Sequence, residues 1–161
     1  MRRFLRFCDR IQSLGGALAS LLVLLLTGLI LTEIVMRSFF DRSTMIADEY
    51  SGYLYLAMVF LALGYTFREK GHIRITLLHS RLSPEGQRRL DLFAGVLLLG
   101  ILAFLLYYSV RMVLDAYRFE MVSETVSETP IWITQLPIPV GTALFLLADL
   151  AFLIRRFRRD L

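Results

Sequence analysis

Residues 11–32 read IQSLGGALASLLVLLLTGLILT and carry no charged side chain over 22 positions. Crossing the hydrocarbon core of a bilayer takes about 20 helical residues, and lipid offers no hydrogen-bond partner to a backbone outside a helix or closed barrel. Three further uncharged windows follow, at residues 50–67, 92–110 and 129–148. The sequence therefore predicts an all-α integral membrane protein with four transmembrane helices.

The composition agrees with this fold class. Hydrophobic residues make up 57% of the 161 residues before the ten glycines are counted, which is more than a soluble domain of this length buries. One cysteine and two histidines exclude a disulfide framework and the usual Cys/His zinc clusters. The sequence carries no phosphate-binding loop, nucleophile motif or paired catalytic carboxylates. We therefore expect no enzymatic activity, no cofactor and no metal.

Local signals place the ends of the four spans. Ser83 is typical of a helix N-cap, with Pro84 at the first helical position and Glu85 in the first turn. The prolines between residues 130 and 139 delay the start of the last helix. Within a single domain, residues 1–161, the predicted spans are 12–36, 47–68, 84–113 and 135–154.

Two amphipathic stretches flank these spans. In residues 2–11 apolar and arginine side chains fall on different helical faces, which favours a short helix lying on the membrane surface. The connection 69–83 mixes leucine and isoleucine with basic residues and predicts a second interfacial helix near 75–82. The residues expected to anchor the chain to phospholipid are Arg3, Arg6, Arg10, Arg74, Ile75, Leu78, Arg81, Leu82 and Trp132.

Lysine and arginine divide unequally between the two sides of the membrane. Of the 18 in the chain, 14 lie before the first span, between the second and third, or after the fourth. The opposite side holds four arginines and eight acids. The positive-inside rule therefore predicts that both termini are cytoplasmic. The basic residues then face lipid headgroups, and we expect no nucleic-acid partner.

Charged residues near the span ends are interpreted as ion pairs. Glu33 precedes Arg37 by one turn, and Asp149 lies close to Arg155 and Arg156. Small residues predict close helix contacts, either among the chain's own helices or with a second membrane protein. The small residues considered for contact with a partner are Gly15, Gly16, Ala19, Ser20, Gly52 and Gly64.

Three segments together resemble one family. They are ADEYSGYLYLAMVFLALGYTFRE at residues 47–69, REKGHIRITLLHSRL at 68–82 followed by RRLDLF at 88–93, and TPIWITQLPIPVG at 129–141. In this order, within a chain of four spans, they resemble the small membrane subunit (Q-type) of tripartite ATP-independent periplasmic (TRAP) transporters. The resemblance covers residues 33–153; the chain departs from the family pattern at Met45 and Ile46, where a tryptophan is expected before the acidic pair.

The resemblance implies a role in secondary-active import across the bacterial inner membrane. A large multi-span subunit would carry an organic acid, either a carboxylate or a sulfonate, together with sodium. A periplasmic binding protein would deliver that substrate, and this chain would be a static scaffold for an elevator-like transport subunit. The acids expected to contact the periplasmic protein are Asp48, Glu49, Glu120, Glu124 and Glu128.

Two functions of other classes stay open on the residues alone. A small self-associating exporter that exchanges protons for cationic drugs needs an acid in the membrane, and Glu33 is its candidate. The second alternative is a membrane assembly subunit without a role in transport. The family-like segments favour the TRAP interpretation over both.

Overall fold

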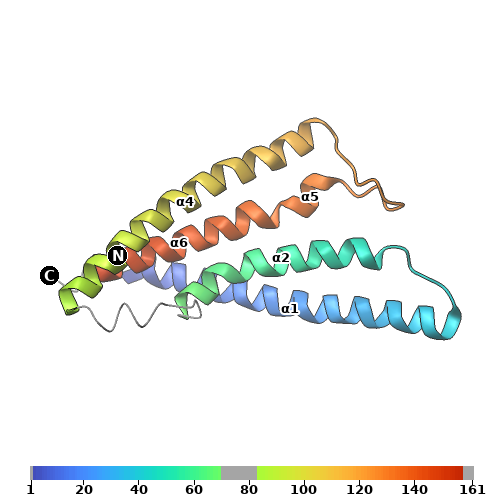
Figure 1. Ribbon diagram of the computed structural model, residues 1–161, viewed down its shortest axis with the longest axis horizontal. Coiled ribbons are helices and arrows are strands. Elements are labelled where there is room, and N and C mark those ends of the chain that lie inside the picture. Colours follow the sequence, from blue (N-terminus) through green and yellow to red (C-terminus); the bar gives the residue numbers. More distant parts are fainter. Residues whose placement is uncertain (1, 70–82, 158–161) are drawn as a thin grey trace.

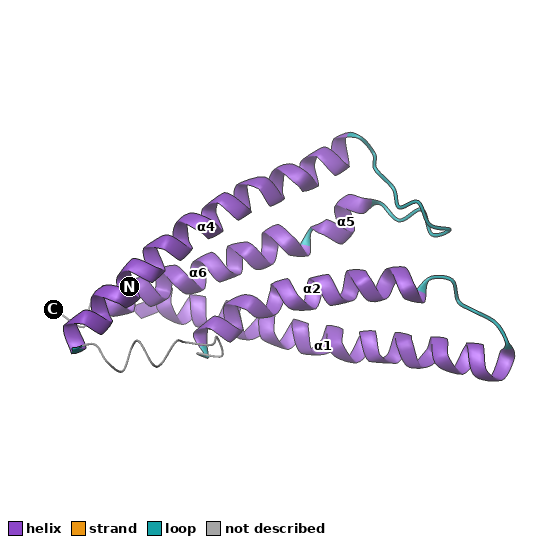
Figure 2. Ribbon diagram, in the orientation of Figure 1, coloured by secondary structure: helices purple, strands orange, loops and turns teal. Residues whose placement is uncertain are grey.

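The chain forms a bundle of helices joined by loops (Figures 1 and 2). The computed structural model describes residues 2–69 and 83–157. Its helices are α1 (Arg2–Phe40), α2 (Ala47–Arg68), α4 (Pro84–Arg118), α5 (Ile131–Gln135) and α6 (Pro137–Phe157). Within the described residues, four helical stretches are long and apolar enough to cross a membrane: α1, α2, α4, and α5 together with α6.

The first helix is longer than its predicted span. α1 is continuous from Arg2 to Phe40, so the predicted surface segment 2–11 and the span 12–36 form a single helix. Cys8, which belongs to the apolar face of the surface segment, is buried in the bundle and 1% exposed. The location of 2–11 on the membrane surface stays a prediction, and the interfacial helix predicted near 75–82 falls outside the described residues.

Helix starts follow local chemistry. The predicted N-cap of α4 is confirmed, because the Ser83 hydroxyl accepts a hydrogen bond from the Gly86 backbone N–H at 3.3 Å. The prolines, which the sequence predicts to delay the start of the last helix, coincide with a break between two helices. α5 ends at Gln135, and α6 begins at Pro137, whose ring nitrogen has no hydrogen to donate. Pro139 lies in the first turn of α6, where a missing N–H costs no helical bond.

The α1 helix packs through one narrow face. Its buried positions at Cys8, Gln12, Gly15 and Ala19 recur at spacings of four, three and four. This alternation is the spacing of helices that cross at a shallow angle and interdigitate along their length. The face meets α2, where a side chain at Gly15 would lie 2.9 Å from the Leu61 carbonyl oxygen.

The centre of the bundle is α6, which lies between α2 and α4 (Figure 1). On the α2 side, the Phe67 ring lies 5.3 Å from the Phe145 ring and 5.7 Å from the Phe152 ring, measured between centroids. Also on this side, a Cβ at Gly141 would collide with the Phe60 backbone. The glycine thus permits a helix contact that no larger residue allows.

Long-range contacts define two ends of the bundle. At the basic end, the start of α1 and the ends of α2 and α6 meet around Asp9, and α6 also contacts the start of α4. At the acidic end lie the α1–α2 connection, residues 41–46, and the long loop between α4 and α5, residues 119–130 (Figure 1). The predicted functional residues divide between these two ends.

Candidate functional site

The basic end is closed by arginines that reach across helices. Arg155 of α6 donates to both Asp9 carboxylate oxygens of α1, at 2.6 and 2.8 Å. Arg68 of α2 donates to the Asp9 backbone carbonyl at 2.5 Å and to the Ser13 hydroxyl at 2.9 Å. These bonds fix three helix ends to one another, which sequence spacing alone did not indicate.

The predicted membrane anchors at this end are exposed where they are described. Arg3, Arg6 and Arg10 all lie on the open surface of α1. The other predicted cytoplasmic anchors fall outside the described residues: Arg74, Ile75, Leu78, Arg81 and Leu82. Contact of any of these residues with lipid stays a prediction.

The predicted ion pair of Asp149 with Arg155 or Arg156 is not formed, because Arg155 binds Asp9 and Arg156 has another partner. Arg156 Nη2 lies 2.8 Å from Asp91 Oδ2 on α4. Asp149 is completely buried and neither carboxylate oxygen accepts a hydrogen bond from a described residue. Asp149 faces α4 at Gly95, where an added Cβ would lie 3.6 Å from Oδ1. Asp149 and Arg156 are separated by two helical turns, or about 10 Å of rise, so the arginine reaches the neighbouring helix instead.

Most of the small residues proposed for partner contact pack inside this chain. Gly15 and Gly16 meet α2, with a Gly16 Cβ placed 2.8 Å from the Tyr65 ring. Gly64 accommodates the buried Gln12 side chain, which donates to the Leu144 carbonyl at 2.6 Å.

Two members of that set are open to the outside. Outside the neighbouring backbone of its own helix, no atom of the described residues lies within 4 Å of a Cβ built at Gly52, so a Cβ there meets open space. Ser20 is exposed and donates to the Gly16 carbonyl one turn back. Ala19, by contrast, is 5% exposed. Gly52 and Ser20 are therefore the members of this set that are left accessible to a second membrane protein.

At the acidic end, Glu33 binds the α1–α2 connection. Its carboxylate accepts hydrogen bonds from Arg37 Nε at 2.5 Å, from the Ser43 hydroxyl at 2.6 Å, and from both the N–H and the hydroxyl of Thr44. The residue is 7% exposed. Charge-assisted bonds of this kind are the strong ones, and four of them occupy both oxygens. Sequence spacing predicted Arg37 as a partner but missed Ser43 and Thr44, which lie ten and eleven residues away.

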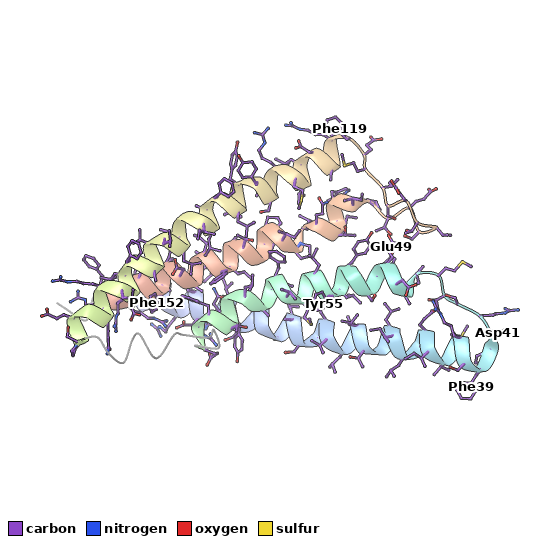
Figure 3. The ribbon with its side chains drawn as sticks, viewed as in Figure 1. Phe39, Asp41, Glu49, Tyr55, Phe119 and Phe152 are labelled. Atoms are coloured by element: carbon purple, nitrogen blue, oxygen red, sulfur yellow. The ribbon has the colours of Figure 1, made fainter. Side chains whose placement is uncertain are left out.

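A second glutamate at this end, Glu49, lies in the first turn of α2 and turns toward the loop between α4 and α5 (Figure 3). Glu49 Oε1 accepts from the Tyr53 hydroxyl at 2.6 Å. Oε2 accepts from the Ser127 hydroxyl at 2.5 Å and from the Thr125 hydroxyl. Glu49 was expected to contact a periplasmic protein, whereas its carboxylate here binds hydroxyl groups of its own chain.

The loop that Glu49 binds is a short hairpin, defined here as residues 121–131. The Ser123 N–H donates to the Thr129 carbonyl, and the Ile131 N–H donates to the Met121 carbonyl, both at 2.9 Å. Thr129 is further joined to α2, because its hydroxyl lies 3.1 Å from the Tyr50 hydroxyl. The hairpin is thus attached to α2 as well as to the helices on either side of it in sequence.

Four of the five predicted docking acids lie on the surface at this end. Asp48, Glu120, Glu124 and Glu128 are all exposed. Asp48 also lies 3.7 Å from Arg37 Nη2, with 93% of its side chain exposed. Trp132, a predicted membrane anchor, lies on the short helix α5. Its ring packs edge-on against the Tyr117 ring, with 5.6 Å between centroids.

Comparisons with known proteins identify relatives. Residues 26–159 match the family model of the DctQ component of tripartite ATP-independent periplasmic transporters. Over 143 residues the chain is 27% identical to the ectoine TRAP transporter small permease protein TeaB of Halomonas elongata, covering 89% of this chain and 72% of that protein. Over 75 residues it is 31% identical to a Haemophilus influenzae protein provisionally named a TRAP transporter small permease protein, covering 47% of each.

Proposed function

This chain belongs to the DctQ component family, the small permease subunits of TRAP transporters, and we propose that it is the fixed scaffold of such a transporter. In this proposal a large multi-span subunit carries the substrate and sodium, and a periplasmic binding protein delivers the substrate. The transporter imports a small organic acid, a carboxylate or a sulfonate, across the bacterial inner membrane. The relative from Halomonas elongata bears ectoine in its name.

The observation that carries the scaffold role is the contrast between the two faces of α1. One face is interlocked with α2, while the other exposes large apolar side chains along the helix, including Leu14, Leu18, Leu21, Leu24 and Leu31. Such a surface needs lipid or another membrane protein against it. An elevator-like transport subunit slides against a fixed wall, and an interlocked bundle with an apolar exterior supports that use.

The proposed orientation places the basic end in the cytoplasm. Arginines gather there on α1, α2, α4 and α6, whereas five of the seven exposed acids among the described residues lie at the other end: Asp41, Asp48, Glu120, Glu124 and Glu128. The positive-inside rule supports this orientation. Arg3, Arg6 and Arg10 then meet the anionic cytoplasmic leaflet and hold the bundle upright against the moving subunit.

The acidic end is proposed as the docking surface for the periplasmic protein. Asp48, Glu120, Glu124 and Glu128 supply exposed negative charge there. Electrostatic complementarity of this kind raises the association rate and weakens with salt.

The exporter alternative loses its candidate residue. A proton-coupling acid must release and rebind its proton in the course of transport, whereas Glu33 accepts three hydrogen bonds from the neighbouring loop and one from Arg37 of its own helix. Those bonds favour a structural role for Glu33. The assembly-subunit alternative differs from the proposal only in the partner that the chain binds.

Reconstituted transport tests this proposal. The chain, its genomically neighbouring large subunit and the binding protein are placed in proteoliposomes with labelled candidate acids and an imposed sodium gradient. We expect uptake that requires all three proteins and the gradient. Uptake by the large subunit and binding protein alone, at the full rate, would contradict the scaffold role.

A further inference from the structure

The hairpin contains a duplicated tripeptide, Ser123–Thr125 and Ser127–Thr129, each reading Ser-Glu-Thr, with Val126 between the copies. The two copies meet in a turn, where the Glu128 N–H donates to the Thr125 carbonyl at 3.1 Å. The Ser123 and Thr125 hydroxyls lie 2.9 Å apart, and those of Ser127 and Thr129 lie 2.8 Å apart. Thr125 and Ser127 donate to Glu49, and the Ser123 hydroxyl receives the Thr129 N–H at 3.0 Å. The duplication therefore gathers four hydroxyl groups, two of which donate to the single carboxylate of Glu49.

The other residues of the same segment are exposed. Glu124 and Glu128 are exposed, and Val126 between them is 82% exposed. Glu128 also adopts a left-handed backbone conformation, with φ of 45°, which turns the chain back toward α5. We call this exposed series, Glu124, Val126 and Glu128, the hairpin edge.

We propose that Glu49 is a positioning residue: it holds the hairpin against α2 through the hydroxyls of the repeat, so that the hairpin edge is presented in one orientation to the periplasmic binding protein. The inference rests on the proposed docking function of the acidic end. The partner surface that fits is an apolar spot flanked by cationic side chains. Glu49 itself does not touch that partner.

The mechanism is preorganisation. A free loop loses conformational freedom when it binds a partner, and a loop that is already ordered does not. Tyr53, one turn after Glu49, holds the other carboxylate oxygen and so fixes the glutamate rotamer. The hairpin is thus ordered by a chain of contacts that runs from the helix α2 through Tyr53 and Glu49 to Thr125 and Ser127.

The test separates positioning from direct contact through four variants of the subunit, assembled with the large subunit. Glu49→Ala removes the carboxylate, and Glu49→Gln keeps a side chain that can still bond with hydroxyls, which donate and accept alike. A Thr125→Val, Ser127→Ala double variant removes the hydroxyls and leaves Glu49 in place. Glu124→Gln alters the hairpin edge alone.

Two readouts are taken on each variant. The first is the mobility of a spin label at Val126→Cys, in a background where the native Cys8 is replaced by serine, without any binding protein present. The second is the dissociation constant of the binding protein for the assembled membrane complex. The first readout needs no partner, so it tests the Glu49–hairpin contact even where docking itself fails.

We expect Glu49→Ala and the hydroxyl double variant each to increase the mobility of the spin label. Each should also raise the dissociation constant of the binding protein by about tenfold, which is the cost of ordering one or two side chains and their loop. Combining them should add little further, because both remove the same interaction. Glu49→Gln should retain most of the docking, and Glu124→Gln should weaken docking without freeing the label.

Three results would overturn the proposal. An unchanged label in Glu49→Ala would show that Glu49 does not order the hairpin. A loss of docking in Glu49→Gln as large as in Glu49→Ala would show that the negative charge contacts the partner directly. A mobile label with undiminished docking would show that the hairpin edge is not what the partner binds. If wild-type complex binds no binding protein, the docking function fails while the label still reports on Glu49.

Discussion

Arg156 at the end of α6 lies 2.8 Å from Asp91 near the start of α4, and this ion pair fastens the central helix to the outer one at the basic end. The side chains are 24% and 15% exposed, so the pair is only partly screened by water. A pair in this position resists the separation of α4 from α6. It takes the place of the Asp149 contact that the sequence suggested.

A double-mutant cycle on this pair should show coupling. Asp91→Asn and Arg156→Gln are each expected to lower the unfolding free energy, and the double variant to lower it by less than their sum. Contacting charged residues couple by roughly 0.5–3 kcal/mol. Thermal unfolding of the purified subunit in one detergent measures all four proteins, and strict additivity would count against the contact.

Close packing of α6 on α2 predicts that replacing Gly141 lowers the stability of the subunit. Gly141→Ala places a methyl group against the Phe60 backbone, which cannot move as a side-chain tip can. Overpacking of this kind costs about 1–3 kcal/mol, so the midpoint of thermal unfolding should fall.

The matched control for Gly141 is Gly100→Ala on α4. Apart from the neighbouring backbone of α4, no atom in residues 2–69 or 83–157 lies within 4 Å of a Cβ at Gly100. Since alanine favours helix over glycine, this change should leave the midpoint unaltered or raise it slightly. Equal losses at the two positions would contradict the helix contact at Phe60.

At the acidic end, Glu33 is predicted to matter for stability rather than for proton coupling. Glu33→Ala leaves the donors of Arg37, Ser43 and Thr44 without their shared acceptor, and should lower stability by about 1–3 kcal/mol. The pH dependence of uptake by the reconstituted transporter should not shift. A shift in that profile with unchanged stability would restore the coupling-acid interpretation.

Gly52 offers a probe of the contact with the large subunit. Because a Cβ at this position meets no other helix or loop among the described residues, Gly52→Leu should leave thermal unfolding of the isolated subunit unchanged. We expect co-purification with the large subunit to fall severalfold if Gly52 lies in the interface. Gly64→Leu, which would displace Gln12, serves as a control that disrupts helix packing within the subunit itself. Full co-purification of Gly52→Leu would remove this position from the interface.

The sequence predicted those features that depend on local chemistry. Uncharged runs predicted the four apolar helices because hydrophobicity is carried by the residues themselves, and the Ser83–Pro84 start of α4 follows from bonds within one turn. The role of Glu49 depends on Thr125 and Ser127, which are 76 and 78 residues away. The partner of Arg156 likewise lies on another helix. No periodicity within one segment indicates such pairs, although the repeated Ser-Glu-Thr was a visible sign that the hydroxyls had a shared use.

The most direct test of the scaffold account is the composition of the native complex. The tagged subunit is extracted from its own membranes in a mild detergent, and its partners are identified and counted by mass spectrometry. The account predicts one large multi-span membrane protein at equal stoichiometry, retained through purification. Recovery of the subunit only as an oligomer of itself would contradict the account.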